Sequence, residues 1–287
     1  MKITEKIYAA LLGIALLCTP SCQVNELLTK DIEVQQLSAE EENRVLIEKA
    51  RNGEAEALHE LALRHRDGIG TPQNIMSAFI YQGIFSSKSG EIDTSSMNIF
   101  EEGTAAHIFT LMLENPTDTP FMQQKLDELA DVCPLEAEAF SILSNMNKDI
   151  DYTDGIRRLE ELEKEGSTLA VLMQVMYFEE TRDDTRYEAI LKRACEKQPF
   201  YHALLGEFYE RKYNGIEDLH WVEKAKEHYQ EADRYALLTP RFARHYYQLL
   251  EHFNKENLIP CSPEEICRIK RLAGVKDVAA DNNNREE

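Results

Sequence analysis

The chain has 287 residues, of which 52 are Asp or Glu and 32 are Lys or Arg, so its formal net charge is -20. Nucleic acids and anionic membrane surfaces are bound through basic patches that replace counterions, and this charge argues against both kinds of partner. The composition has only 12 Gly and 9 Pro and is rich in Leu, Ala, Glu and Lys. Such a composition is typical of a helical protein rather than a β-sandwich or barrel.

The N-terminal segment, residues 1–22, has the outline of a bacterial signal peptide. The basic side chains of Lys2 and Lys6 precede an apolar run from Ile7 to Leu17, and small residues follow up to Cys22. The run is shorter than the ~20 residues that a helix needs to cross the hydrocarbon core, which argues against a transmembrane anchor. We therefore predict that residues 1–21 are a signal peptide and that the chain is exported across the inner membrane.

The segment Thr19-Pro20-Ser21-Cys22 resembles a lipobox, the motif in which a cysteine becomes the lipidated first residue of a mature lipoprotein. The resemblance implies that lipid on Cys22 anchors the protein to a membrane of the bacterial cell envelope, facing the periplasm or the cell surface. A lipobox usually has Leu where this chain has Thr19, so ordinary cleavage after Ser21 is the alternative.

Regular structure is expected to begin at Ser38. Ser38 and Glu41 have the spacing of a capping box, in which a hydroxyl and a carboxylate bind backbone N–H groups of the first helical turn. Residues 22–37 lack a strong hydrophobic period and are predicted to be a tether. Residues 38–273 are predicted to be a helical-repeat domain, and the polar residues 274–287 a disordered tail.

The spacing of helix-breaking residues indicates an internal repeat. About a dozen helices are predicted within residues 38–273, and no stretch has the alternation typical of a strand. Gly103, Pro134, Gly166 and Pro199 follow one another at intervals of 31, 32 and 33 residues, and each interval holds two predicted helices. A period of this length is typical of tetratricopeptide-like folds. We therefore expect an all-α fold, an alpha-solenoid of antiparallel helix pairs, with a non-repeating bundle as the alternative.

The stretch HELALRHRDGIGTPQNIMSAFIY contains fragments of two catalytic motifs. A zinc-protease helix needs two histidines four residues apart, whereas His59 and His65 are six apart and point about 240° apart on a helix. Gly68 and Gly70 follow a predicted helix rather than a strand, and no Lys-Ser/Thr pair closes the loop as in a phosphate-binding site. Neither a metal site nor a nucleotide site is expected here.

The same stretch, taken from Gly53 onward, resembles the Sel-one-like repeat, a relative of the tetratricopeptide repeat. The family pattern has a Gly, an Ala four residues later, a Leu-Gly pair, an aromatic residue, a Gly-x-Gly turn and an Ala followed by aromatic residues. The matching positions are Gly53, Ala57, Leu61, Gly68, Gly70, Ala78 and Tyr81. The chain departs from the pattern at Ala62, His65, Thr71 and Asn74, where Gly, Tyr, Val and Asp are usual. A second copy comprises Leu205, Gly206, Tyr209, Gly215, Ala225, Tyr229 and Ala232.

The resemblance implies helix pairs that cross closely and a protein that is not an enzyme. Small residues such as Ala57 let two antiparallel helices approach, and the turn glycines permit a tight connection between them. By analogy with repeat proteins of this kind, the chain is expected to be a scaffold for protein-protein interaction that needs no cofactor and no metal.

The last third of the chain is rich in histidine and aromatic residues. Many of its aromatic residues lie at helical spacing and are expected in the core, but Tyr213, Trp221 and Tyr247 fall outside these stripes. Since Trp and Tyr are enriched among interface hot spots, we predict that these three side chains bind a protein or peptide partner. The histidines of this region are His202, His220, His228, His245 and His252.

Two other functions are compatible with the sequence. The histidine-rich third could be a metal-binding or hydrolytic module, although no nucleophile motif and no cysteine pair at metal spacing is present. The protein could also be a structural spacer between other components, in which case the aromatic surface would be dispensable.

Four cysteines follow Cys22. Cys261 and Cys267 lie six residues apart at the start of a predicted helix and are a candidate disulfide, with two free thiols as the alternative. Cys133 and Cys195 are expected to be buried in helix cores, either paired or as reduced thiols.

Overall fold

The computed structural model describes residues 38–89, 99–114, 119–145, 152–216, 218–255, 258 and 260–275. These residues form thirteen α-helices and contain no strand, as the composition predicts. The helices are α2 (Ala39–Arg51), α3 (Ala55–Asp67), α4 (Ile75–Ser89), α5 (Ala105–Glu114), α6 (Thr119–Val132), α7 (Pro134–Asn145), α8 (Tyr152–Glu165), α9 (Thr168–Glu180), α10 (Asp184–Cys195), α11 (Tyr201–Ile216), α12 (Leu219–Arg234), α13 (Pro240–Lys255) and α14 (Pro263–Leu272). The predicted signal peptide, the predicted lipidation site Cys22, the predicted tether and residues 276–287 of the predicted tail lie outside the described residues.

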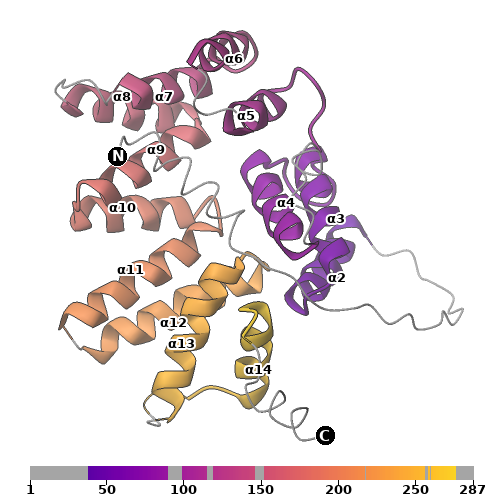
Figure 1. Ribbon diagram of the computed structural model, residues 1–287, viewed down its shortest axis with the longest axis vertical. Helices are drawn as coiled ribbons and strands as arrows, with labels where there is room; N and C mark the ends of the chain where they lie inside the picture. Colours follow the sequence, from indigo (N-terminus) through magenta and orange to yellow (C-terminus); the bar gives the residue numbers. More distant parts are fainter. Residues whose placement is uncertain are drawn as a thin grey trace, which may run out of the picture.

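Successive helices pack as pairs that stack into a solenoid (Figure 1). The pairs are α3 with α4, α5 with α6, α7 with α8, α9 with α10, α11 with α12, and α13 with α14. Three of these pairs occupy the intervals that begin at Gly103, Pro134 and Gly166. The predicted all-α solenoid of helix pairs is therefore confirmed.

The solenoid bends so that its first helices lie beside its last ones. In Figure 1, α5 to α8 lie at the top and α9 to α13 descend from them, while α2 to α4 lie to the right of this column. Helix α2 packs against α12 as well as against its neighbour α3. The two ends of the repeat array are thus in contact.

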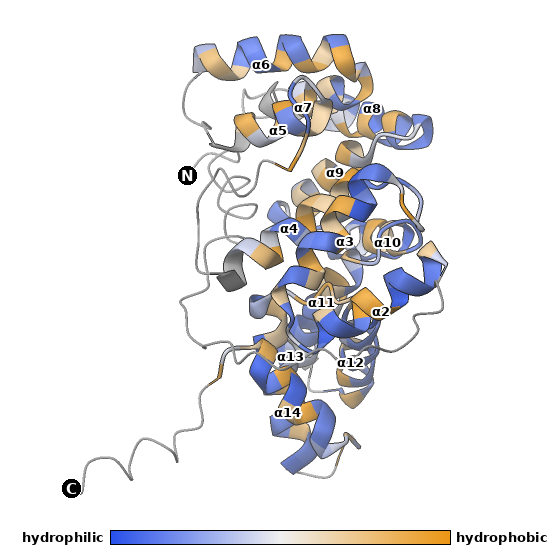
Figure 2. Ribbon diagram, turned by 90° about the vertical axis from the view of Figure 1, so that its right-hand side faces the viewer, coloured by the Kyte–Doolittle hydropathy of each residue, from blue (hydrophilic) through white to orange (hydrophobic). Residues whose placement is uncertain are grey.

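Most helices have one apolar face, and residues 169–175 of α9 are buried on all sides. Hydrophilic and hydrophobic residues alternate along α6 at the top of Figure 2, whereas α9 is mostly hydrophobic. Residues 169–175 of α9 are all buried, because this helix packs against α7, α8 and α10. A helix surrounded on all sides has no solvent face to keep polar.

Helix starts follow the capping residues predicted from the sequence. The backbone N–H of Glu41 donates to Oγ of Ser38 over 3.2 Å, and the backbone N–H of Ser38 donates to Oε2 of Glu41 over 2.9 Å. This capping box begins α2 as predicted. At α14, Oγ of Ser262 accepts from the backbone N–H of Glu265, and Pro263 occupies the first helical position.

The first repeat, formed by α3 and α4, has the small residues and the turn that its sequence predicts. The matching apolar residues Ala57, Leu61, Ala78 and Tyr81 are all buried. Gly68 ends α3 with φ of 71°, a left-handed conformation that residues with a Cβ rarely adopt. The glycines of this stretch therefore serve a tight turn between two helices.

The second copy brings α11 and α12 into close contact through a glycine. A Cβ added to Gly206 would lie 2.9 Å from the ring of Tyr229, which is completely buried. Leu205, Tyr209 and Ala225 are buried as well. Gly215 lies in the last turn of α11, which ends at Ile216, rather than in the connection to α12.

Replacing Gly206 by alanine is expected to lower the free energy of unfolding by about 1–2 kcal/mol, although alanine is the better helix former. The Tyr229 ring cannot move away easily, since it stacks on Tyr246 with 5.3 Å between ring centroids and its hydroxyl donates to Glu210. Urea unfolding followed by circular dichroism measures the change. The matched control is Gly83→Ala in α4, where a Cβ meets no atom within 4 Å. This control is expected to gain about 0.5–1 kcal/mol. Equal effects of the two substitutions would contradict the close crossing of α11 and α12.

Candidate functional site

Of the three aromatic residues predicted to bind a partner, Tyr213 and Trp221 are half-buried and Tyr247 is buried. Tyr213 is half-buried against Phe253, with 5.1 Å between ring centroids, and it lines a pocket of about 270 Å³ between α11, α12 and α13. Tyr247 is only 8 % exposed, and its hydroxyl donates to Glu251 of the same helix. The prediction that Tyr247 lies outside the core was wrong, because α13 packs against α11, α12 and α14 and so buries more than one face.

Trp221 belongs to a stack of rings between α11 and α12. Its ring lies 5.6 Å from that of Tyr209 and nearly parallel to it, and Nζ of Lys224 lies 4.8 Å from its centroid. On its other side, the ring of Tyr209 stacks on that of His228 with 5.5 Å between ring centroids. His228 in turn stacks on His202 with 5.0 Å between ring centroids. Trp221 is half-buried, and these contacts tie the two helices together.

The two histidines at the end of this stack are held neutral. Their Nδ1 atoms lie 2.8 Å apart, so one ring donates a hydrogen bond to the other. Burial, together with the neighbouring His202, lowers the pKa of His228 to about 4, and burial also lowers the pKa of His202. The pair thus contributes a hydrogen bond between two neutral rings at neutral pH.

As the pH decreases from 7 to 4, protonation of this histidine pair is expected to lower the free energy of unfolding by roughly 1–2 kcal/mol. A histidine whose pKa is lower in the folded state binds its proton more readily when unfolded, so acid favours unfolding below the ordinary histidine pKa. The measurement is urea unfolding of the parent protein and of His228→Phe at several pH values. The variant is expected to be less stable at pH 7, and this difference should shrink toward pH 4. A difference that stays constant with pH would contradict the assignment.

The described residues of the histidine-rich third show no metal site. Among the residues that the structure describes, no group of three or more His, Cys, Asp or Glu side chains is arranged to hold a metal ion. His228 is engaged with His202, and the exposed His220 packs against Trp221 with 5.5 Å between ring centroids. The metal-binding or hydrolytic alternative therefore gains no support from these side chains.

All four cysteines in the described part of the chain are free thiols. The candidate disulfide between Cys261 and Cys267 is not formed. Instead, Sγ of Cys261 donates to Oε2 of Glu265 over 3.1 Å, and Cys267 is exposed on α14. Burial and the carboxylate of Glu265 raise the pKa of the Cys261 thiol to about 12.

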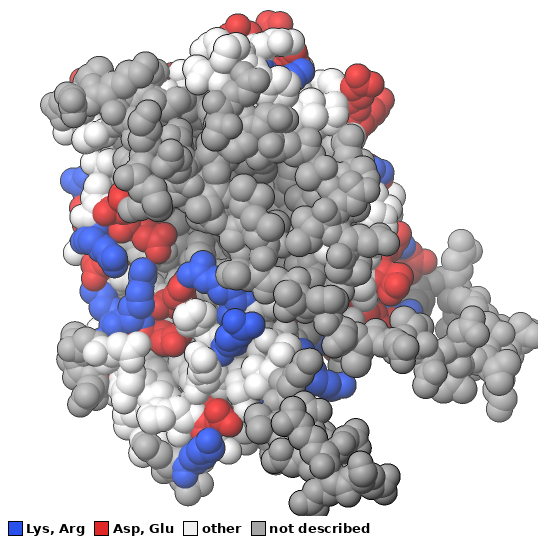
Figure 3. Space-filling model, viewed as in Figure 1, with Lys and Arg blue, Asp and Glu red and all other residues white. Residues whose placement is uncertain are grey.

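Charged side chains do not by themselves mark a binding surface. On the face shown in Figure 3, acidic and basic side chains are interspersed at the lower left, where α10 to α13 lie in Figure 1. Ion pairs such as Lys212 with Asp184 and Arg211 with Glu179 link neighbouring helices. Exposed pairs of this kind contribute little to stability and are screened by salt.

The strongest candidate for a binding site is an apolar pocket of about 310 Å³ between the first repeat and α5 to α9. Its volume falls within the range of about 300–1,000 Å³ that is typical of ligand pockets. The apolar lining includes Ile75, Met76 and Phe79 of α4, Phe109 of α5, Leu129 of α6 and Leu169 of α9. The thiol of Cys133 lines the pocket as well.

The polar groups of this pocket are bonded to other protein groups. The amides of Asn74 and Gln198 exchange two hydrogen bonds of 3.0 and 3.1 Å, and Oγ of Ser77 donates to Oε1 of Gln198. The carboxylate of Glu136 accepts hydrogen bonds from Ser167, Thr168 and Leu169 at the start of α9. The pocket therefore offers apolar contact inside a rim of polar groups that already have partners.

Sequence reasoning missed this pocket. Phe79 and Phe109 are ordinary apolar positions of amphipathic helices, and no motif distinguishes them. A pocket made by several separate helices leaves no local pattern in the sequence.

Comparisons of the chain with protein-family models, with curated proteins and with solved structures find no match. None of the helices in the described part of the chain has the length and apolar character that crossing a bilayer requires.

Proposed function

We propose that the protein is a non-enzymatic helical-repeat scaffold that binds a protein or peptide partner through the apolar pocket between the first repeat and α5 to α9. The observation that carries this proposal is the pocket itself, with its lining of Met76, Phe79, Phe109 and Leu169. A buried pocket that accepts one apolar side chain is the usual anchor point of a protein interface.

The chemistry of the pocket favours an apolar anchor. Displacing water from apolar lining yields roughly 25 cal/mol per Å² of buried apolar surface, so a Leu, Met or Phe side chain of a partner would gain most. Asn74 and Gln198 bind each other, and Glu136 caps α9, so these polar groups offer little to a charged ligand. Because its carboxylate is engaged in capping, Glu136 has a structural role rather than one in proton transfer.

The proposal includes an anchor in the bacterial cell envelope and kinship with Sel-one-like repeats. The predicted signal peptide and the lipobox-like residues before Cys22 support the anchor. The buried small residues of the first repeat and the close contact of Gly206 with Tyr229 support the kinship. An anchored scaffold of this kind would hold a partner at the membrane.

A photo-crosslinking residue placed at Met76 tests the proposal in cells that produce the full chain. Met76 lines the pocket and is half-buried, so a bound partner would lie within reach of the probe. We expect one discrete crosslinked species at Met76 and none at Val45, an exposed apolar residue of α2 that is 44 % exposed.

A second probe position separates the two candidate surfaces. Tyr213 lines the pocket between α11, α12 and α13. A discrete crosslinked species at Tyr213, with none at Met76, would place the partner at the pocket between α11, α12 and α13 and refute the pocket beside α4 as the binding site. No species at either position would refute the proposed binding role, and equal labelling at Met76 and Val45 would show contact without specificity.

A further inference from the structure

Polar contacts join α2 and the first repeat, which packs against it, to the C-terminal half of the chain. Nη2 of Arg51 in α2 lies 3.0 Å from Oδ2 of Asp233 in α12, although the two residues are 182 positions apart in the sequence. The hydroxyl of Tyr81 in α4 donates to the backbone carbonyl of Tyr235 over 2.6 Å. Together with the amide pair of Asn74 and Gln198, these contacts hold α2 to α4 against the later helices.

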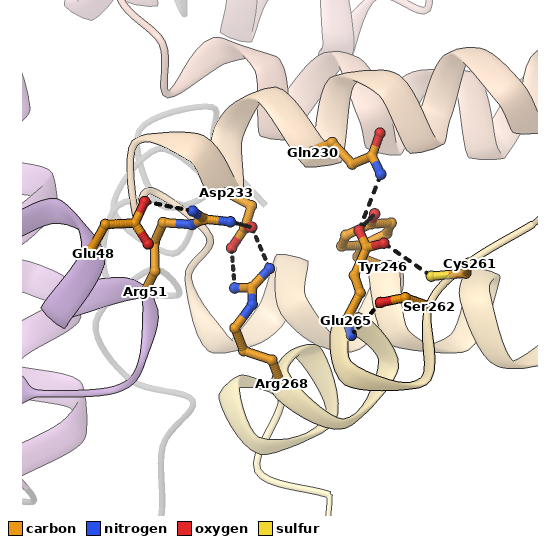
Figure 4. A network of polar contacts seen from close by, with 9 residues as sticks. All are labelled: Glu48, Arg51, Gln230, Asp233, Tyr246, Cys261, Ser262, Glu265 and Arg268. Atoms are coloured by element: carbon orange, nitrogen blue, oxygen red, sulfur yellow. Dashed lines mark hydrogen bonds and ion pairs between the residues drawn. The ribbon is translucent and has the colours of Figure 1, made fainter. Parts of the chain in front are cut away.

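Asp233 is the centre of the strongest of these connections. Its side chain is only 4 % exposed, and its two carboxylate oxygens accept hydrogen bonds of 2.7 and 2.5 Å from the guanidinium of Arg268 in α14. Arg51 of α2 binds the same carboxylate through Nη2, and its other terminal nitrogen binds Glu48 (Figure 4). One buried carboxylate thus joins α2, α12 and α14.

The surroundings of Asp233 hold its C-terminal partners in place. Glu265 of α14 accepts hydrogen bonds from Gln230 of α12, from the hydroxyl of Tyr246 in α13 and from the thiol of Cys261 (Figure 4). These bonds fix α12, α13 and α14 relative to one another, independently of α2. The link from Asp233 to α2 runs through Arg51, whose Nη2 atom bonds Asp233 across the boundary.

The position of the first repeat decides whether the apolar pocket exists. Ile75, Met76 and Phe79 of α4 form one wall, and residues of α5, α6 and α9 form the others. If α2 to α4 moved away from α12 and α14, α4 would move with them and the pocket would lose that wall. Cys133 lines the same pocket and is half-buried, and it would then become more accessible to solvent.

We propose that Asp233 is a clasp that closes the first repeat onto the C-terminal repeats through Arg51 and thereby controls access to the apolar pocket. While Arg51 binds Asp233, the pocket is preformed. When this link is broken, the walls of the pocket become accessible. The functional meaning of this access rests on the proposed binding role, but the opening itself is a property of the chain and is measured without a partner.

The test is the rate at which N-ethylmaleimide alkylates each thiol of the full chain, measured peptide by peptide with mass spectrometry. The variant Arg51→Gln cuts the link from α2 but leaves the pair of Asp233 and Arg268 intact. Removing one member of a buried ion pair is costly, so we expect Cys133 to react at least about tenfold faster than in the parent. The matched control is Glu48→Gln, which removes the exposed partner of Arg51 and is expected to leave the rate unchanged.

Two other thiols distinguish clasp opening from general unfolding. Cys195 is half-buried near Tyr201 and Tyr209 of α11, away from the clasp, and Cys267 is exposed in the folded protein. If the clasp opens, we expect faster alkylation of Cys133 and unchanged alkylation rates at Cys195 and Cys267.

Three results would overturn the proposal, and none of them decides the proposed function. The first is an unchanged alkylation rate at Cys133 in both Arg51→Gln and Asp233→Asn. The second is an alkylation rate that rises equally at Cys195, which means loss of the whole fold. The third is an equal rise of the Cys133 rate in the control Glu48→Gln. The crosslinking result at Met76 decides the binding role independently, because it is measured with the clasp intact.

Discussion

Replacing Asp233 by alanine is expected to lower the free energy of unfolding by about 3–5 kcal/mol, the usual cost of removing one partner from a buried ion pair. The substitution leaves the guanidinium groups of Arg51 and Arg268 partly buried without the carboxylate that both of them bind. Burying a charge without a partner carries a desolvation penalty that the folded state then bears. Urea unfolding at neutral pH, followed by circular dichroism, measures the loss.

The control for this prediction lies two residues earlier on the same helix. Glu231, whose side chain is 25 % exposed, pairs with Arg234, whose side chain is 71 % exposed. We expect Glu231→Gln to change the free energy of unfolding by less than about 0.5 kcal/mol, because exposed pairs contribute little. A loss below about 1 kcal/mol for Asp233→Ala would show that the network does not hold the helices together.

The variant Gly70→Ala is expected to lose roughly 2–4 kcal/mol of unfolding free energy. Gly70 has φ of +65°, which strains any residue with a Cβ, and a Cβ there would lie 2.3 Å from the backbone carbonyl oxygen of Ala39. That oxygen belongs to the first turn of α2, so the turn or the helix must shift. Thermal and urea unfolding of the purified chain without residues 1–22 measure the cost.

Gly274 provides a control with the same backbone conformation. It also has φ of +65°, but a Cβ added there meets no atom within 4 Å. Gly274→Ala is therefore expected to lose only the ~1 kcal/mol of the left-handed conformation itself. If the two variants lose the same amount, the contact between the turn of the first repeat and α2 is absent.

The sequence predicts the features of the fold that depend on neighbouring residues. The capping box at Ser38 acts within one helical turn, and the intervals from Gly103 to Pro199 each contain one complete helix pair. The alanines of the first repeat are buried because the two helices that carry them are adjacent in the chain. Interactions within one helix, or between two helices that follow each other in the chain, leave a periodic pattern in the sequence.

The closure of the solenoid has no such pattern. Arg51 and Asp233 resemble many other charged residues of a chain in which charged residues make up 29 %. Their pairing depends on the accumulated bend of the intervening helices, which no single repeat determines. The same bend places α13 among three other helices, and this is why Tyr247 is buried despite its position outside the predicted core stripe.

The pocket and the clasp both require that the first repeat lie against the C-terminal helices. The most direct measurement is the distance between spin labels at Val45 of α2 and Glu227 of α12, both exposed positions, in a chain whose native cysteines are replaced by serine. Pulsed electron paramagnetic resonance is expected to give one narrow distance distribution, which broadens in Arg51→Gln. A broad distribution in the chain that retains Arg51 would contradict the closed solenoid, and with it both the pocket and the clasp.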